Sequence, residues 1–372
     1  MSAVQYHYGK FPPKILDWEK LIPLVGPANA SLARYDGVLS AIPNAAVLLS
    51  PLTTQEAVLS SRIEGTQATM GEVLEFEADG NRKGLPEEKK NDIWEVLNYR
   101  KAMNHAEKRL KELPLCQRVI KECHAILLDG VRGHGKSSGE YRRIPNWIGP
   151  QGCAMEQARF VPISAGDLDN GMGAWDVYVN GDAPDRLVQL AILHAEFEAL
   201  HPFLDGNGRL GRMFVPLFMF QTGLIHRPMF YVSAYFEAKR DEYYDRLLAV
   251  SRDGDWTGWC TFFLKAVQTQ AEQNLAKTNA ILALYNRMKL QIPELTHSQY
   301  AIHALNWIFE KPIFKSSDFV DTAGIPRATA FKTLKKLKDA GLFVELRARS
   351  GQSASVLGYR ELLNIAEGYD AF

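Results

Sequence analysis

The hydrophobic positions of the chain repeat mostly at helical spacing, and the most regular repeats flank one polar stretch. Between Ala183 and Leu200, apolar side chains recur three and four residues apart, which predicts a helix with a buried face. Residues 213–220 are nearly all apolar and predict a second buried helix. Residues 201–212 carry a histidine, a carboxylate, three glycines and two arginines. Polar chemistry between two buried helices indicates a functional site.

The rest of the chain also has a mainly helical pattern. Prolines punctuate residues 1–30 and argue against a long helix there. Further along, the periodicity predicts helices over residues 29–40, 53–74, from Trp94 onward, 115–128, 231–252 and 255–288. The expected fold class is therefore mainly α.

Residues 141–164 are the strongly non-helical part of the middle of the chain. Trp147-Ile148-Gly149 and Arg159-Phe160-Val161-Pro162-Ile163 flank a Gly-Pro-Gln-Gly stretch, which predicts a β-hairpin. An isolated hairpin is marginally stable, so it should pack on the helices, either as decoration or as part of a site.

A proline-marked boundary at residues 291–294 precedes a different pattern. Helices are expected over 298–309, 316–323 and 327–340, followed by a two-stranded hairpin from Leu342 to Leu357. Three helices and a hairpin are the order of a winged helix. We therefore expect domains at 1–110, 111–290 and 291–372, the last of them a small winged-helix-like domain.

Composition narrows the class of protein. The 43 basic and 43 acidic residues balance, so no overall charge favours nucleic acid or membranes. The four cysteines lack Cys-x-x-Cys spacing, which fits reduced thiols. The first residues do not resemble a secretory signal, and no apolar run is long enough to span a membrane. A cytoplasmic protein without membrane contact is expected.

Each residue type in 201–212 suits a nucleotide phosphate site. Gly206 and Gly208 around Asn207 allow strained backbone angles and expose N–H groups, which bind phosphate at a helix start. Arg209 and Arg212 are three residues apart and share a helix face.

The same stretch supplies a metal ligand and a base. Asp205 offers hard oxygen ligands to magnesium, and His201 can accept a proton near neutral pH. The less specific explanation is a glycine turn between helices, with a buried histidine and solvated arginines.

The stretch resembles the Fic family signature, His-x-Phe-x-(Asp/Glu)-Gly-Asn-Gly-Arg-x-x-Arg, at every specified position. The resemblance implies that AMP moves from ATP to a hydroxyl of a target protein. It implies that His201 is the base, that Asp205 holds Mg²⁺, and that the following turn and arginines bind ATP. That ATP-binding set is Gly206, Asn207, Gly208, Arg209, Leu210, Gly211 and Arg212.

A second motif gains weight from this resemblance. Ser60-Ser61-Arg62-Ile63-Glu64-Gly65 alone describes an amphipathic helix with a solvated glutamate. Many Fic proteins carry a Ser/Thr-x-x-x-Glu-Gly/Asn inhibitory motif, here Ser60 and Glu64, on an N-terminal helix over about 53–74. The resemblance implies that Glu64 pairs with Arg212 and displaces the γ-phosphate.

The resemblance also assigns the hairpin and a downstream helix. In Fic proteins the hairpin, here 141–164, forms a flap whose edge pairs with the target by strand addition. We expect Ile148 and the strand from Val161 to Ser164 near the nucleotide and the target, and Tyr243 and Tyr244 near the adenine. Both tyrosines also suit plain packing.

Three further patterns keep alternatives open. His194, Glu198 and His201 share a helix face, but they are too few to fix zinc alone, so His194 is expected to be structural. Residues 130–137 match a P-loop pattern but lack the preceding strand that it needs, so we treat the match as coincidence. Lysines on 327–340 could contact DNA, although such faces are usually only solvated.

The function predicted is protein adenylyl transfer to Ser, Thr or Tyr, with Glu64 as an inhibitor. The alternatives are other Fic transfer reactions, removal of AMP in the same site, and a nucleotide-sensing transcription regulator. The sequence does not decide the target protein or whether the chain forms a homo-oligomer.

Overall fold

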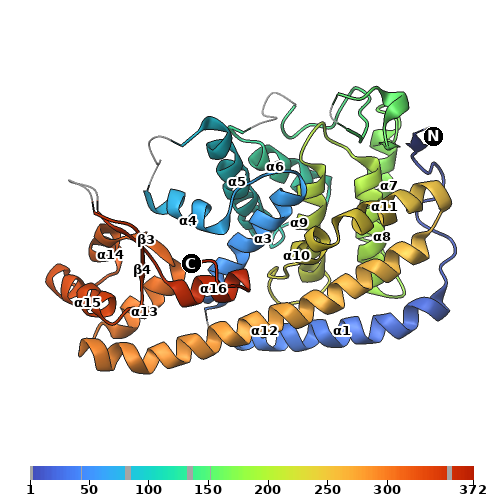
Figure 1. The fold of residues 1–372 in the computed structure, drawn as a ribbon. Helices are drawn as coiled ribbons and strands as arrows, with labels where there is room; N and C mark the ends of the chain where they lie inside the picture. The colour runs from blue at the N-terminus through green and yellow to red at the C-terminus, as the bar shows by residue number, and fades with distance from the viewer. Residues whose placement is uncertain (1–2, 43, 80–84, 132–136, 151, 350–353) are drawn as a thin grey trace. The chain divides into compact units, whose positions relative to one another are not determined.

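The computed structural model describes residues 3–42, 44–79, 85–131, 137–150, 152–349 and 354–372. The fold is mainly helical, as predicted (Figure 1). No helix in these ranges is long and apolar enough to cross a membrane. Of the P-loop-like match, residues 132–136 lie outside the described residues.

Eight helices precede the polar stretch in the described residues, together with two short strands. They are β1 (Val4–Gln5), α1 (Trp18–Ala41), α2 (Ala45–Leu48), α3 (Ser50–Ile63), α4 (Met70–Asp79), α5 (Glu87–Arg109), α6 (Gln117–Leu127), β2 (Phe160–Val161), α7 (Leu168–Val179) and α8 (Arg186–Leu200). A single 3₁₀ turn covers Met155–Gln157.

Eight more helices and three strands follow among the described residues. They are α9 (Asn207–Gln221), α10 (Ser233–Ala238), α11 (Arg240–Asp253), α12 (Trp256–Thr296), α13 (Ala301–Glu310), β3 (Ile313–Lys315), α14 (Ser316–Thr322), α15 (Arg327–Asp339), β4 (Val344–Arg347), β5 (Val356–Gly358) and α16 (Arg360–Glu367).

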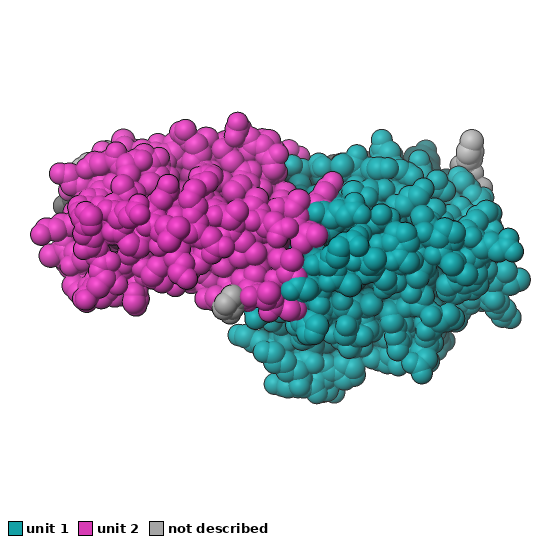
Figure 2. Space-filling model, turned by 90° about the horizontal axis from the view of Figure 1, so that it is seen from below, with its two compact units in different colours: residues 1–37, 59–66, 97–272 teal, residues 38–58, 67–96, 273–372 magenta. Residues whose placement is uncertain are grey.

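The chain forms two compact units, coloured separately in Figure 2. Unit 1 contains residues 1–37, 59–66 and 97–272, and unit 2 contains residues 38–58, 67–96 and 273–372. Each unit takes segments from distant parts of the chain. The division into domains 1–110, 111–290 and 291–372 stays a prediction.

Unit 1 is built around the helix pair α8 and α9, and α7 also packs on α8. Nearly every residue of α8 is buried, which is why its sequence is apolar on almost all faces. Asp185 caps this helix by accepting a hydrogen bond from the Val188 N–H at 2.9 Å. The two helices predicted beside the polar stretch are confirmed, and they hold its ends rigidly.

The first long helix starts earlier than predicted. Helix α1 begins at Trp18 and contains Pro23 and Pro27. Leu21, Ala28 and Leu32 are fully buried along one of its faces. Burial of this face outweighs the local cost of the prolines, so the expectation that they prevent a long helix was wrong.

The helix predicted over 53–74 is two helices with a break at residues 64–69. Gly65 takes a positive φ of 101°, and the Thr66 N–H bonds back to the Ser61 carbonyl, which closes α3. Thr69 and Glu72 then bond each other's backbone N–H groups. This capping box starts α4, and the break leaves Glu64 just beyond the end of α3.

The predicted hairpin at 141–164 is reduced to a single antiparallel bridge between Ile148 and Phe160. The other edge of β2 pairs in parallel with β1, Val4 opposite Phe160 and Gln5 opposite Val161. Both edges of this short strand are therefore occupied. The two predicted segments do pair antiparallel, but only through this bridge in the described residues, because β2 finds its main partner at the N-terminus.

Unit 2 contains a three-stranded antiparallel sheet of order β3-β5-β4 together with α13, α14 and α15. The three helices and the last two strands were predicted, whereas β3 was not. Helix α12 continues past the predicted boundary at 291–294, because Leu284, Met288 and Ile292 keep one buried face. The winged-helix assignment stays a prediction.

Candidate active site

The polar stretch forms a tight loop between α8 and α9. His201 ends α8 in the left-handed conformation (φ 46°), and Gly206 (φ 79°) precedes α9. The Asn207 side chain accepts from the Phe203 N–H and donates to the Phe203 carbonyl, both at 2.9 Å. Asn207 therefore shapes the loop from inside, and its side chain is not directed at a ligand.

Two residues that the sequence did not single out hold this loop. Arg142 donates to the backbone carbonyls of His201 and Leu200 at 2.9 and 3.3 Å, and also to that of Ile163. It thus ties the loop to the 141–164 segment.

His124 supports the loop from the other side. It stacks on Phe203 and accepts from the Gly139 N–H at Nδ1, so Nε2 carries the hydrogen that reaches the Asp205 carbonyl. Only the three-dimensional contacts identify Arg142 and His124, since neither lies in a motif.

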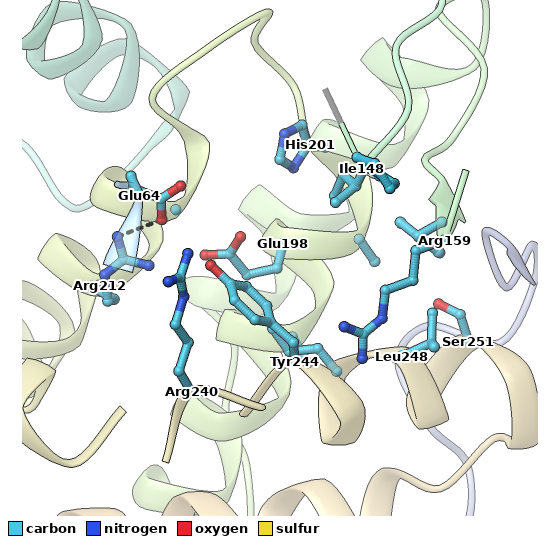
Figure 3. A pocket seen from close by; sticks show the side chains of 17 residues that line it. Glu64, Ile148, Arg159, Glu198, His201, Arg212, Arg240, Tyr244, Leu248 and Ser251 are labelled. Atoms are coloured by element: carbon cyan, nitrogen blue, oxygen red, sulfur yellow. Dashed lines mark hydrogen bonds and ion pairs between the residues drawn. The ribbon is translucent and has the colours of Figure 1, made fainter. Parts of the chain in front are cut away.

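His201 has the properties of a proton acceptor. Burial lowers the pKa of its imidazole to about 4, so the ring is neutral at pH 7. Its Nδ1 is buried and has no hydrogen-bond partner among the described atoms. The ring faces the cavity in Figure 3.

Arg212 is fully buried and lies opposite Glu64. It donates to the Ser60 hydroxyl at 3.0 Å, to the Ser60 carbonyl at 2.8 Å and to the Glu64 carboxylate at 2.6 Å. The last contact is the dashed line in Figure 3. Burial alone would lower the pKa of Arg212, but the Glu64 carboxylate raises it. The predicted contact between Glu64 and Arg212 is thus present.

Two glycines of the stretch make room for carboxylates. A Cβ on Gly208 would lie 2.2 Å from a Glu64 carboxylate oxygen, and a Cβ on Gly211 would lie 2.2 Å from a Glu198 oxygen. Any side chain at either position would displace these groups. Gly208 therefore lets Glu64 lie against the first turn of α9, where phosphate oxygens also bind well.

Glu198 also belongs to the site, although its sequence position suggested only a possible metal ligand. Burial raises the pKa of its carboxyl to about 8, so it is largely protonated at pH 7. Its Oε1 has no hydrogen-bond partner within the described structure.

His194 is structural, as expected. It bonds the Gly211 carbonyl and the Tyr243 hydroxyl, and burial lowers its pKa to about 3. No group of three potential metal ligands occurs among the described residues.

Glu64, Glu198, His201, Gly208 and Arg212 line one cavity of about 500 Å³ in unit 1. One end is polar and holds Glu64, His201, Gly208 and Arg212. The remaining wall is largely apolar, with Arg159, Arg240, Tyr244 and Ser251 among its polar members. Its apolar side chains include Ile148, Pro150, Phe160, Leu247 and Leu248. A polar end joined to an apolar wall has the shape and chemistry to hold a nucleotide.

The structure separates the predicted base-binding residues. Tyr244 and Ile148 line the cavity, whereas Tyr243 and Val161 do not. The Tyr243 ring is buried, stacks on Phe236 and bonds His194. Its position in the aromatic core corrects the expectation that it faces the nucleotide. Val161 instead uses its backbone to pair with the N-terminal strand.

Asp205 and Arg209 lie together at the mouth of the loop. The Asp205 carboxylate accepts from the Gly206 N–H at 2.7 Å and lies 3.6 Å from Arg209. Its side chain is 33% exposed, so an ion in the solvent can reach the carboxylate. Mg²⁺ in phosphate sites often takes one or two carboxylates and completes its shell with phosphates and water. The residues present fit such an ion.

Comparison with known proteins agrees with this geometry. Residues 22–108 match the Fic/DOC family N-terminal region, and residues 114–219 match the Fic/DOC family itself. The chain belongs to the Fic/DOC family. The match includes Glu64 in its first part and the whole 201–212 signature in its second.

Curated relatives in this family are adenylyltransferases. The chain is 26% identical over 203 residues to protein adenylyltransferase Fic of Drosophila grimshawi, and 24% identical over 253 residues to that of Drosophila virilis. The alignments cover 52% and 65% of this chain, but only 37% and 45% of the relatives. The chain thus matches less than half the length of each relative.

Solved structures show the same fold at low identity. A Fic family protein from Desulfovibrio desulfuricans matches with a TM-score of 0.57 and 17% identity, over 94% of this chain and 97% of that one. A Fic domain containing signaling protein from Bacteroides thetaiotaomicron matches with a TM-score of 0.56 and 17% identity, over 68% and 96%. The Fic-type helical fold predicted from the sequence is confirmed.

Proposed function

We propose that this Fic/DOC protein transfers AMP from ATP to a Ser, Thr or Tyr hydroxyl of a target protein. The observation that carries the proposal is the neutral His201 ring beside the first turn of α9, in a cavity with one polar and one largely apolar part. A base at a phosphate-binding helix start suits attack by a hydroxyl on a phosphate. The adenylyltransferase names of the relatives support the choice of reaction.

The residues of this chain divide the work as follows. The target hydroxyl gives its proton to His201 while its oxygen attacks the α-phosphate of ATP. The bond from the α-phosphorus to the bridging oxygen breaks, and pyrophosphate leaves. Arg209, Arg212 and the first N–H groups of α9, from Asn207 to Arg209, bind the phosphates and stabilise the charge that develops on them. Asp205 would hold Mg²⁺, which neutralises phosphate charge when bound.

Autoinhibition by Glu64 is part of the proposal. Its carboxylate lies against Gly208 and takes up one guanidinium nitrogen of Arg212. A phosphate at the same place would meet a like charge and lose a ligand. ATP and Glu64 therefore compete for Arg212, and Ser60 holds the arginine in place for either partner.

The target is proposed to dock on the 141–164 flap. Ile144, Trp147 and Met155 are 58%, 42% and 39% exposed there, so this segment offers apolar side chains to a partner. Both edges of β2 are occupied, so a docking strand would have to pair elsewhere in the flap. The resulting partner is a protein with an extended segment that carries the hydroxyl.

Mass spectrometry of a cell lysate treated with ATP and the Glu64→Gly variant tests this function. We expect the mass of one AMP on a Ser, Thr or Tyr of the variant itself or of another protein. The same lysate with Glu64→Gly and His201→Ala combined is the matched control. Loss of AMP from modified proteins, rather than gain, would favour the reverse reaction in this site.

A further inference from the structure

A hydrogen-bonded chain of buried side chains ends at the wall of the nucleotide cavity. His7 Nδ1 lies 2.8 Å from the Ser251 hydroxyl, and His7 Nε2 lies 2.8 Å from the Glu196 carboxylate. The Tyr6 hydroxyl donates to the other Glu196 oxygen at 2.6 Å. All four residues belong to unit 1. Ser251 lines the cavity with His201, and Figure 3 shows it at the end far from Glu64.

The chemistry of this chain fixes the direction of its hydrogen bonds. An ionised carboxylate can only accept, so Glu196 accepts from Tyr6 and from Nε2–H of His7. In the neutral imidazole the other nitrogen, Nδ1, can then only accept. With His7 in this neutral form, the Ser251 hydroxyl donates its proton to Nδ1, and its oxygen offers only lone pairs to any other group.

The network is held rigidly at its base. His7 and Glu196 have fully buried side chains, and the His7 ring packs edge-on against Trp256 with 5.2 Å between centroids. The neighbouring β1 strand pairs with β2, which anchors Tyr6 and His7. The hydroxyl of Ser251 is thus a preorganised acceptor, since the network leaves it no freedom to turn its proton away from His7.

The position of Ser251 indicates which part of a nucleotide it meets. Phosphates belong at Gly208 and Arg212, at the polar end of the cavity. The base then lies along the apolar wall, where Leu247 and Leu248 lie on the same helix as Ser251. An acceptor at this place on the wall distinguishes bases by the polarity of their edges.

We propose that Ser251 is a specificity-determining residue that accepts a hydrogen bond from the exocyclic amine of adenine and disfavours guanine, whose carbonyl oxygen would face its lone pairs. His7 and Glu196 are positioning residues that hold the hydroxyl in its accepting orientation. The inference rests on the proposed function, because it places the phosphates at the signature.

Calorimetric binding of the α,β-methylene analogues of ATP and GTP with Mg²⁺ tests the proposal. The Glu64→Gly variant serves as the parent, since its Arg212 is open to phosphate. In this parent, Ser251→Ala should lower the ATP-to-GTP affinity ratio about tenfold, as expected for one lost hydrogen bond. Ser251→Thr keeps the hydroxyl and should retain the ratio.

His7→Gln is the second arm, because it removes the ring nitrogen that accepts the serine proton without touching the cavity wall. The freed hydroxyl can then donate, so the affinity for the GTP analogue should rise relative to that for the ATP analogue. Thermal unfolding of each variant checks its fold.

Three results would overturn the inference. The first is an unchanged ratio in Ser251→Ala, and the second is an equal loss for both analogues, as a merely structural role predicts. The third is AMP attached to Ser251 itself after incubation with ATP, which would make it an acceptor of the transfer. If the parent binds neither analogue, the phosphate site and with it the proposed function also fail.

Discussion

Arg212 is the residue on which the account of regulation depends. It is fully buried and donates hydrogen bonds to Ser60 and Glu64, which lie 152 and 148 positions earlier in the sequence. A buried guanidinium needs such partners, because leaving it uncompensated is costly. Only one of the two, Glu64, has a partly exposed side chain, at 33%. In the proposed function it is therefore the partner that ATP would replace.

Replacing Glu64 by Gly should raise AMP transfer by about tenfold or more. The substitution frees one Arg212 nitrogen for phosphate and removes a like charge, and together these effects typically amount to a factor of that order. The same change should cost about 1–2 kcal/mol of stability without nucleotide, because Arg212 loses a charged partner. ATP should then raise the melting temperature of Glu64→Gly more than that of the unsubstituted protein.

Glu88→Gly, at an exposed position of α5, is the control for the glycine itself. An unchanged rate of AMP transfer in Glu64→Gly would contradict inhibition by this residue.

Glu198 gives a pH-dependent prediction at the same scale. Its folded pKa of about 8 lies above the unfolded value near 4.5, so its stabilising contribution is complete below pH 4.5 and is lost as the pH rises through 8. Gln resembles the protonated form. The melting temperature of the unsubstituted protein, compared with that of Glu198→Gln at the same pH, should therefore fall as the pH rises from 5 to 9. A difference that stays constant over this range would show that Glu198 is ionised throughout.

Some of the site residues could be predicted from the sequence and others could not. The signature specified His201 and Arg212 because their types and spacing are tied to one chemistry. Tyr243 and Tyr244 looked equivalent because adjacent positions on a helix differ only in direction. Packing against Phe236 and His194 decides which one is buried, and no local pattern reports that packing.

At the scale of elements, the N-terminal strand is the least expected feature. β1 and β2 pair across more than 150 residues of sequence, so no local periodicity could have predicted their contact. Residues 6–7 then reach the buried Glu196. The break after α3, by contrast, has a local signal, because Thr69 and Glu72 form a capping box that starts a new helix. The continuous helical periodicity on both sides led to the prediction of one helix instead of two.

Tyr6→Phe tests how firmly this strand is anchored. The substitution removes a hydrogen bond to a buried carboxylate and should cost about 1.5–3 kcal/mol. Tyr369→Phe is the matched control, because the Tyr369 side chain is 62% exposed and its loss of a hydroxyl should change stability by about 0.5 kcal/mol or less. Chemical denaturation measures both. Equal effects of the two changes would mean that the Glu196 contact does not hold β1.

At the scale of the whole molecule, the balanced charge extends into the C-terminal segment. Arg347 and Lys315 both bond Asp79, which lowers the pKa of that carboxyl to about 2. Lys336 donates to the Thr296 carbonyl, and Arg327 lies 3.4 Å from Asp321. Arg347, Lys315 and Arg327 are thus paired with carboxylates of the chain itself, and Lys336 is tied to a backbone carbonyl.

We therefore predict only weak, salt-sensitive binding of the full chain to duplex DNA. Binding driven by phosphate contacts alone has dissociation constants of about 10⁻⁴–10⁻⁶ M at physiological salt. Fluorescence anisotropy with several unrelated duplexes measures it. Tight binding to one sequence would favour the transcription regulator instead.

The central claim is that this molecule moves the α-phosphate of ATP onto protein, with His201 as the base. Labelling by ATP carrying the isotope in either the α- or the γ-phosphate tests it most directly. The Glu64→Gly variant should label protein from α-labelled ATP and not from γ-labelled ATP, and adding His201→Ala should abolish the signal. Label from the γ-phosphate, or labelling that survives without His201, would contradict the account.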